Sequence, residues 1–201
     1  MRERPISFNS DMVRAILAGA KTQTRRPVKP RKDINFGCEL SPGELAGEIN
    51  RGGDYQNCPF GQPGDRLWVR ESGRVEKIGY SGEWAADIRY SADSALREVI
   101  LPRRIVTPNG PPSWAMGCRG IPNGIFREAA RIHLEIVSVR VERLEDITIA
   151  DAQAEGFPGH GAIIPFIQTW ERIYGRRGFG CDAKPWLWVI EFRRVTATEA
   201  K

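Results

Sequence analysis

Long apolar runs are absent from the sequence, and this absence limits where the protein can reside. No stretch of roughly 18 apolar residues occurs, so we expect no membrane-spanning helix and no membrane partner. The chain starts with Met1-Arg2-Glu3-Arg4-Pro5, which lacks the apolar segment of a signal peptide. We therefore expect a cytoplasmic protein.

Cysteine and histidine are scarce, which argues against a metal centre. No Cys-x-x-Cys pair occurs among Cys38, Cys58, Cys118 and Cys181, and the histidines are His133 and His160. In a reducing compartment such isolated cysteines are most simply free thiols. A zinc site built from them and a histidine would need distant loops to converge, so we expect no metal and no cofactor. We interpret His133 as a surface strand residue rather than a catalyst.

Lysine is rare among the basic residues. Of the 30 basic residues six are lysine and 24 are arginine, the formal charge is +5, and the isoelectric point is near 9.2. Arginine forms bidentate contacts with phosphates and base edges, so the composition favours a nucleic acid or a nucleotide-like ligand. The alternative is that the arginines reflect codon usage or neutralise the 25 acidic residues.

The 201 residues contain no internal repeat, no low-complexity tract and no βαβ units, which favours one α+β domain over residues 1–201. We expect a small, mostly antiparallel β-barrel flanked by two or three helices. The expected strands are residues 5–8, 66–71, 130–144 and 186–195, with weaker candidates at 74–78 and 87–90. The expected helices are residues 10–17, 148–155 and 163–174, with a helical turn at 94–99.

Two segments rich in proline and glycine interrupt this pattern, at residues 27–62 and 92–126. Such a density of proline and glycine opposes regular structure, so we expect two long irregular insertions, and a frayed tail at 196–201. Trp114 lies in the second insertion. Its side chain either stacks on a base or packs into the core and so anchors a surface loop.

A dense polar cluster follows the first expected helix. Gly19 is a natural helix stop, and Pro27 ends the segment that follows, so we expect Lys21 to Arg26 to be briefly extended. In an extended segment, alternate side chains share a face. Lys21 and Thr24 would then point apart unless a turn or bulge follows Gly19.

The spacing of Gly19, Lys21, Thr24 and Arg26 resembles the Gly-x-Lys-x-x-Thr-x-Arg signature of ASCH domains, which are relatives of PUA domains with a small β-barrel. Three further pieces resemble the family in the same order: residues 63–68 (Pro-Gly-Asp-Arg-Leu-Trp), 146–156 and 186–192. The similarity is spread over about residues 5–195. In detail the chain looks closest to ASCH-domain proteins encoded by phages and prophages.

The resemblance implies recognition of RNA, single-stranded nucleic acid or a modified nucleoside. One bacterial branch of the family removes the acetyl group from N4-acetylcytidine, and another has been linked to RNA cleavage. The Lys, Thr and Glu proposed as catalytic in the first branch fall, by motif position, on Lys21, Thr24 and Glu155 of this sequence. The two insertions set this chain apart from the small hydrolases.

The chemistry of an amide hydrolase needs a nucleophile, a base and a donor for the oxyanion. Thr24 could supply the hydroxyl or bind an attacking water, and Lys21 could accept a proton if its pKa is depressed. Glu155 could orient Lys21 or carry a proton to the leaving amine. Alternatively, Lys21, Arg25 and Arg26 form a solvated basic patch, and Glu155 is an ordinary acid at a helix end.

Three hypotheses follow from the sequence. The first is an RNA-binding or nucleoside-binding protein, the second an amidohydrolase of N4-acetylcytidine-type amides, and the third a non-catalytic phage accessory protein. For ligand contacts we expect Arg25, Arg26, Arg66, Trp68, Glu71 and Trp114. Binding is the broader hypothesis, because it includes the first step of hydrolysis.

Overall fold

The computed structural model describes residues 1–116 and 120–195, and within it the chain forms two compact units. The first unit comprises residues 1–2, 18–66 and 135–194, and the second comprises residues 3–17, 67–134 and the chain from Val195. Each unit is described by itself. The expected frayed tail at 196–201 and the free thiol expected at Cys118 lie outside the described residues.

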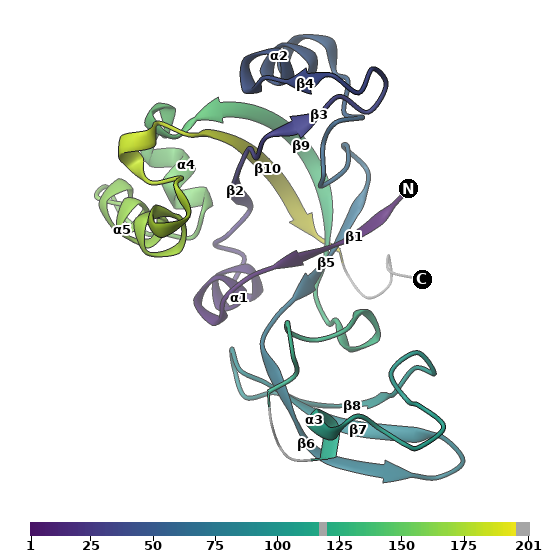
Figure 1. The fold of residues 1–201 in the computed structure, drawn as a ribbon. Coiled ribbons are helices and arrows are strands. Elements are labelled where there is room, and N and C mark those ends of the chain that lie inside the picture. Colours follow the sequence, from purple (N-terminus) through teal and green to yellow (C-terminus); the bar gives the residue numbers. More distant parts are fainter. Residues whose placement is uncertain (117–119, 196–201) are drawn as a thin grey trace. The chain divides into compact units, whose positions relative to one another are not determined.

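The first unit is built on three neighbouring strands in the order β9, β10, β2 (Figure 1). Their bounds are His133–Arg143 for β9, Trp186–Arg194 for β10 and Gln23–Pro27 for β2. The part of β9 from Glu135 onward belongs to this unit. β2 and β10 are antiparallel, with Thr24 opposite Ile190 and Arg25 opposite Val189. The central strand β10 is buried along most of its length, as expected from its apolar sequence.

Helices α4 (Ile149–Ala154) and α5 (Ile163–Tyr174) lie in the first unit. Thr148 caps α4, because its side chain accepts a hydrogen bond from the Asp151 amide while the Asp151 side chain accepts one from the Thr148 amide. The aromatic residues Phe166, Trp170 and Tyr174 repeat at helical spacing on α5 and share a buried cluster with Leu187. Both helices were expected from the sequence.

The first insertion carries more regular structure than expected. Between residues 27 and 62 the chain forms the hairpin of β3 (Arg31–Lys32) and β4 (Glu39–Leu40), then helix α2 (Pro42–Gly47) and the π-helix η1 (Glu48–Gly52). The prediction of irregular structure is wrong here because proline starts the helix. Pro42 occupies the first turn, where no amide donor is required, and Ser41 and Glu44 form a capping box.

The second unit contains β1 (Glu3–Ser7), helix α1 (Ser10–Leu17) and β5 (Arg66–Arg70), whose first residue belongs to the first unit. It also contains the antiparallel sheet of β6 (Gly73–Tyr80), β7 (Trp84–Tyr90) and β8 (Leu96–Ile100). The short helix α3 (Ser113–Met116) lies on this sheet, and Ala115 joins its core (Figure 1).

Short 3-10 helices complete the description: η2 (Arg127–Ala129), η3 (Leu144–Asp146), η4 (Gly175–Arg177) and η5 (Cys181–Ala183). The helical turn expected at 94–99 is wrong, because these residues pair with β7 as the edge strand β8. The α+β class is confirmed. The described strands of neither unit close into a barrel. No helix in the described part of the chain is both long and apolar enough to cross a membrane.

Candidate functional site

The turn after Gly19 brings the polar cluster against the end of α4. Gly19 has a φ of +74°, a conformation that a residue with a side chain adopts only with strain. Lys21 then forms an isolated antiparallel bridge with Glu155, and the Thr22 amide donates to the carbonyl oxygen of Ala154 at 2.8 Å. Residues 134 positions apart in the sequence are thereby held side by side.

Lys21 is enclosed by acceptors. Its Nζ donates to Glu155 Oε2 at 2.5 Å, to the Glu155 carbonyl oxygen at 3.0 Å and to the Gln23 carbonyl oxygen at 2.8 Å. These contacts use all three protons of an ammonium group. Lys21 is 2% exposed and Glu155 4% exposed, so the pair is withdrawn from water. The alternative of a solvated basic patch therefore does not describe Lys21.

Arg25 joins the same cluster from β2. It is 2% exposed, and its Nη1 lies 3.6 Å from Glu155 Oε1, while its Nη2 lies 3.3 Å from Asp151 Oδ1 and 3.4 Å from Glu142 Oε2. The Nε and Nη1 of Arg25 and the Oε1 of Glu155 are buried and make no hydrogen bond with the described residues. Such buried polar atoms are uncommon in folded proteins, and a functional role is one of the explanations for them.

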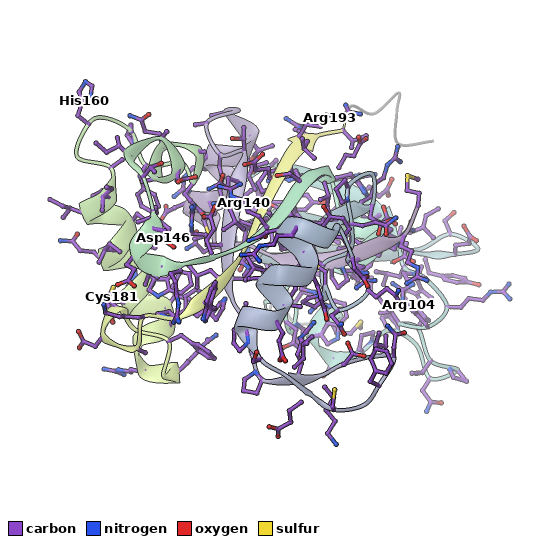
Figure 2. The ribbon with its side chains drawn as sticks, turned by 90° about the horizontal axis from the view of Figure 1, so that it is seen from above. Arg104, Arg140, Asp146, His160, Cys181 and Arg193 are labelled. Atoms are coloured by element: carbon purple, nitrogen blue, oxygen red, sulfur yellow. The ribbon has the colours of Figure 1, made fainter. Side chains whose placement is uncertain are left out.

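A second layer of polar side chains holds the acids of this cluster. Gln23 Nε2 donates to Asp151 Oδ1 at 3.0 Å, and Arg140 Nη2 donates to the same oxygen at 3.1 Å. Arg140, which projects from β9 in Figure 2, also pairs with Glu142 and Glu191. Burial would raise the pKa of Asp151, but hydrogen bonds from Thr148 and Gln23 and the charge of Arg25 together hold it well below its usual value.

The electrostatics of Lys21 differ from those of a surface lysine. Burial lowers the pKa of Lys21 from its ordinary value, and the positive charges of Arg26 and Arg25 lower it further. The contact with Glu155 opposes this shift without cancelling it. A lysine with a lowered pKa loses its proton more readily, which is the property that a general base requires.

Thr24 and Arg26 belong to the other phase of β2. Thr24 is buried opposite Ile190, and Arg26 donates to the hydroxyl of Tyr174 at 3.1 Å. Because side chains alternate along a strand and Gln23 and Arg25 both contact Asp151, Thr24 points to the opposite face. The structure thus brings Lys21 and Glu155 together and gives Thr24 a different environment.

Several residues expected at the site belong to the second unit. Glu71 is 1% exposed and accepts from Arg131 Nε at 2.9 Å and from Arg131 Nη2 at 2.8 Å. Trp68 is buried in the core of that unit, and Trp114 packs against the same core from α3. Arg66, at the start of β5, is half-buried and belongs to the first unit.

Sequence reasoning missed Gln23, Arg140, Glu142 and Asp151 as members of the cluster. The sequence carries a signal for Asp151, because it follows Thr148 by three residues in the pattern of a capping box. Glu142 and Arg140 alternate with the apolar residues Val139 and Val141 on β9, so their shared face was visible in the pattern. The residues that contact this face, by contrast, could not be identified from the pattern.

The described residues contain no group of three His, Cys, Asp or Glu side chains that could hold a metal ion. Cys38, Cys58 and Cys181 are free thiols. Burial, together with Glu171, raises the pKa of the Cys181 thiol to about 11, so little of the nucleophilic thiolate is present near neutral pH.

No protein-family model and no curated protein matches the chain. Among solved structures, the chain is similar to the crystal structure of an ASCH domain from Lactobacillus crispatus JV V101. The sequences are 11% identical, the similarity covers 96% of this chain and 79% of that chain, and the TM-score is 0.42. A similarity at this level carries no argument about function.

Proposed function

We propose that the protein binds RNA or a modified nucleoside at a site formed by residues 19–26 and Glu155. One observation carries the proposal: Lys21, Arg25 and Glu155 form a buried charged cluster in which atoms of Arg25 and Glu155 make no hydrogen bond with the described residues. The resemblance of residues 19–26 to the ASCH signature and the excess of arginine support the same class of ligand.

The two atoms, which are ion-paired with each other but make no hydrogen bond with the described residues, suit the edge of a nucleobase. Glu155 Oε1 is an acceptor, and Arg25 Nη1, 3.6 Å away, is a donor. A cytosine-type base presents an amino donor next to ring and carbonyl acceptors, so one base edge can satisfy both groups. The side chains of Lys21 and Glu155 are 0% and 3% exposed, so a ligand must displace the groups that cover them.

Binding is tested with single-stranded RNA by fluorescence anisotropy over a range of salt concentrations. We expect affinity to fall with salt, because arginine–phosphate contacts release counterions. Arg26→Ala should weaken binding and reduce the salt slope by about one. Arg172→Ala is the matched control, because Arg172 is an exposed arginine of α5 in the same unit. Absence of binding, or binding that is independent of salt, would overturn the RNA form of the proposal.

A second function, hydrolysis of an N4-acetylcytidine-type amide, is favoured by the lowered pKa of Lys21 in contact with Glu155. In this scheme a water molecule adds to the acetyl carbon while neutral Lys21 accepts its proton. The carbon–nitrogen bond then breaks, the proton passes from Lys21 to the amine nitrogen, and cytidine and acetic acid are released, the acid losing its remaining proton to water. Because Thr24 lies on the other face of β2, water rather than the Thr24 hydroxyl is the nucleophile.

Turnover is tested by incubating the purified protein with N4-acetylcytidine and separating cytidine by chromatography. We expect Lys21→Ala to remove activity and Glu155→Gln to reduce it strongly, since proton transfer contributes roughly 10²–10⁴-fold to such rates. Lys29→Ala is the control, because Lys29 is exposed just beyond β2. Activity that persists in Lys21→Ala would remove Lys21 from the mechanism, and an inactive wild type would leave binding as the function.

A further inference from the structure

A groove of about 870 Å³ lies beside the β3–β4 hairpin of the first unit. Its lining includes Val28, Arg31, Lys32, Leu40, Pro42 and Phe179. Its volume falls within the roughly 300–1,000 Å³ of small-molecule sites. The groove begins one residue after β2 ends, but it contains none of the residues of the Lys21–Glu155 cluster.

The arginine of this groove makes no ion pair with a carboxylate of the described residues. Arg31 is half-buried, and its guanidinium carbon lies 5.5 Å from the centroid of the Trp188 ring. Its Nε is buried and makes no hydrogen bond with the described residues. Burial lowers the pKa of Arg31, and the interaction with Cys58 opposes this shift without cancelling it. Within the described part of the chain, no carboxylate lies within ion-pair distance of Arg31 or of its neighbour Lys32. Arg140, by contrast, pairs with three carboxylates.

The remainder of the lining is mostly apolar and held in place. Val28 and Leu40 are buried, and the amide of Val28 donates to the carbonyl oxygen of Trp186 at 2.8 Å. The backbone of Phe179 is fixed by a hydrogen bond from Trp170 Nε1 at 2.7 Å, and its side chain is half-exposed. An apolar wall with a partly open aromatic ring suits a flat or apolar group.

We infer that this groove binds an organic phosphate, with the phosphate on Arg31, further positive charge from Lys32 at the next position of β3, and the flat body of the ligand against Phe179. A phosphate monoester carries a charge of about −1.5 to −2 near neutral pH and neutralises both cations, whereas a single carboxylate neutralises one. The planar guanidinium of Arg31 is matched to phosphate oxygens. Glu39 also lines the groove, but it is exposed, so water screens its repulsion of an anion.

The phosphate can belong to a free nucleotide or to a nucleic-acid strand, and the experiment distinguishes these sources. The wild-type protein is titrated by calorimetry with cytidine 5′-monophosphate, cytidine, inorganic phosphate and a single-stranded RNA decamer. For a free nucleotide we expect cytidine 5′-monophosphate to bind at least tenfold more tightly than cytidine or inorganic phosphate. For a strand we expect only the decamer to bind.

Both sources predict the same response to substitution. Arg31→Met keeps the apolar stem over Trp188 and removes the charge, so we expect a loss of affinity of at least tenfold. Arg31→Lys should restore part of that affinity, and Glu39→Gln should improve binding about twofold. The control is Lys29→Met, which removes an exposed positive charge outside the groove and should change affinity less than twofold.

Circular dichroism checks that each variant is folded. If Arg31→Met does not fold, Lys32→Met at an exposed position replaces it, with an expected loss of about threefold. No binding of any probe, or equal affinities in the wild type and the Arg31 or Lys32 variant, would overturn the inference. RNA binding that responds to Arg26→Ala but not to Arg31→Met would overturn it and leave the proposed function standing. RNA binding that responds to Arg31→Met but not to Arg26→Ala would support the inference about the groove and not the proposed function.

Discussion

Among the described residues, each unit of the molecule buries a glutamate beside a basic side chain, and the two arrangements differ. In the second unit, Arg131 donates to both oxygens of Glu71 and to both oxygens of Asp93. In the first unit, Glu155 receives Lys21 on one oxygen, and its other oxygen makes no hydrogen bond with the described residues. Both glutamates were expected at the functional site.

The difference separates an ion pair that supports the fold from one available for chemistry. The contacts with Glu71 and Asp93 outweigh burial and raise the pKa of Arg131, so this arginine stays charged. Burial instead lowers the pKa of Lys21, which sets its two protonation states closer in free energy at neutral pH. A satisfied, permanently charged pair fixes structure, whereas an incompletely satisfied pair with a movable proton can respond to a ligand.

The largest expected effect is on stability. Glu71→Ala leaves the buried charge of Arg131 only partly compensated, and we expect a loss of about 3–5 kcal/mol in the free energy of unfolding. Glu155→Ala should cost less, because Lys21 can release its proton when its partner is lost. Urea denaturation followed by circular dichroism measures both. Glu145→Ala, in an exposed pair with Lys184, serves as the control. An equal loss in the first two variants would contradict the distinction.

Ligand binding should depend more strongly on Glu155 than on Glu71, which is the reverse of the order expected for stability. We expect Glu155→Gln to weaken binding of the nucleoside or RNA at least tenfold, because the carboxylate that holds Lys21 and faces Arg25 becomes neutral. Glu71→Gln should change the affinity of the folded protein less than twofold. Titrations of both variants, corrected for the folded fraction, test this prediction. A stronger effect at Glu71 would place that residue in the binding site.

The pH dependence of stability follows from Lys21. Its pKa is lower in the folded protein than the ordinary value of 10.5, so the unfolded chain binds more protons between these two values. The free energy of unfolding of the wild type, relative to Lys21→Met, should therefore rise with pH in that window, by up to about 1.4 kcal/mol per pH unit. Glu155→Gln removes the charge that opposes the shift and should extend the window to lower pH. A difference that stays constant with pH would contradict the lowered pKa.

The smallest expected effect concerns the cap of α4, the helix that carries Asp151 of the Lys21–Glu155 cluster. Thr148→Ala removes the cap of α4, and we expect a loss of about 1 kcal/mol in the free energy of unfolding. Asp151 keeps its contacts with Gln23, Arg25 and Arg140, so binding of the nucleoside or RNA should remain within twofold of the wild type. Thermal unfolding and titration of the same preparation measure both quantities. A large loss of binding would show that the cap positions the site.

The local pattern of the sequence predicted most of the elements correctly. Helices α1 and α5 carry an apolar spacing, and α4 a capping box, that identify them without a structure. The prediction failed for β8, because an edge strand with mostly exposed residues has little periodic signal and forms only when β7 is available for pairing. It failed in the first insertion because proline at a helix start was taken as an interruption.

The sequence by itself determined the α+β class, the extended segment after Gly19 and the alternation that separates Thr24 from Gln23 and Arg25. These features depend on backbone geometry and on neighbours within a few residues. Only the tertiary structure decided that Arg25 is buried and that Glu71 forms an ion pair with Arg131. It also decided that Phe179 lines the same groove as Arg31. The reason is that the pairing of distant side chains depends on how strands and helices pack, which local spacing does not encode.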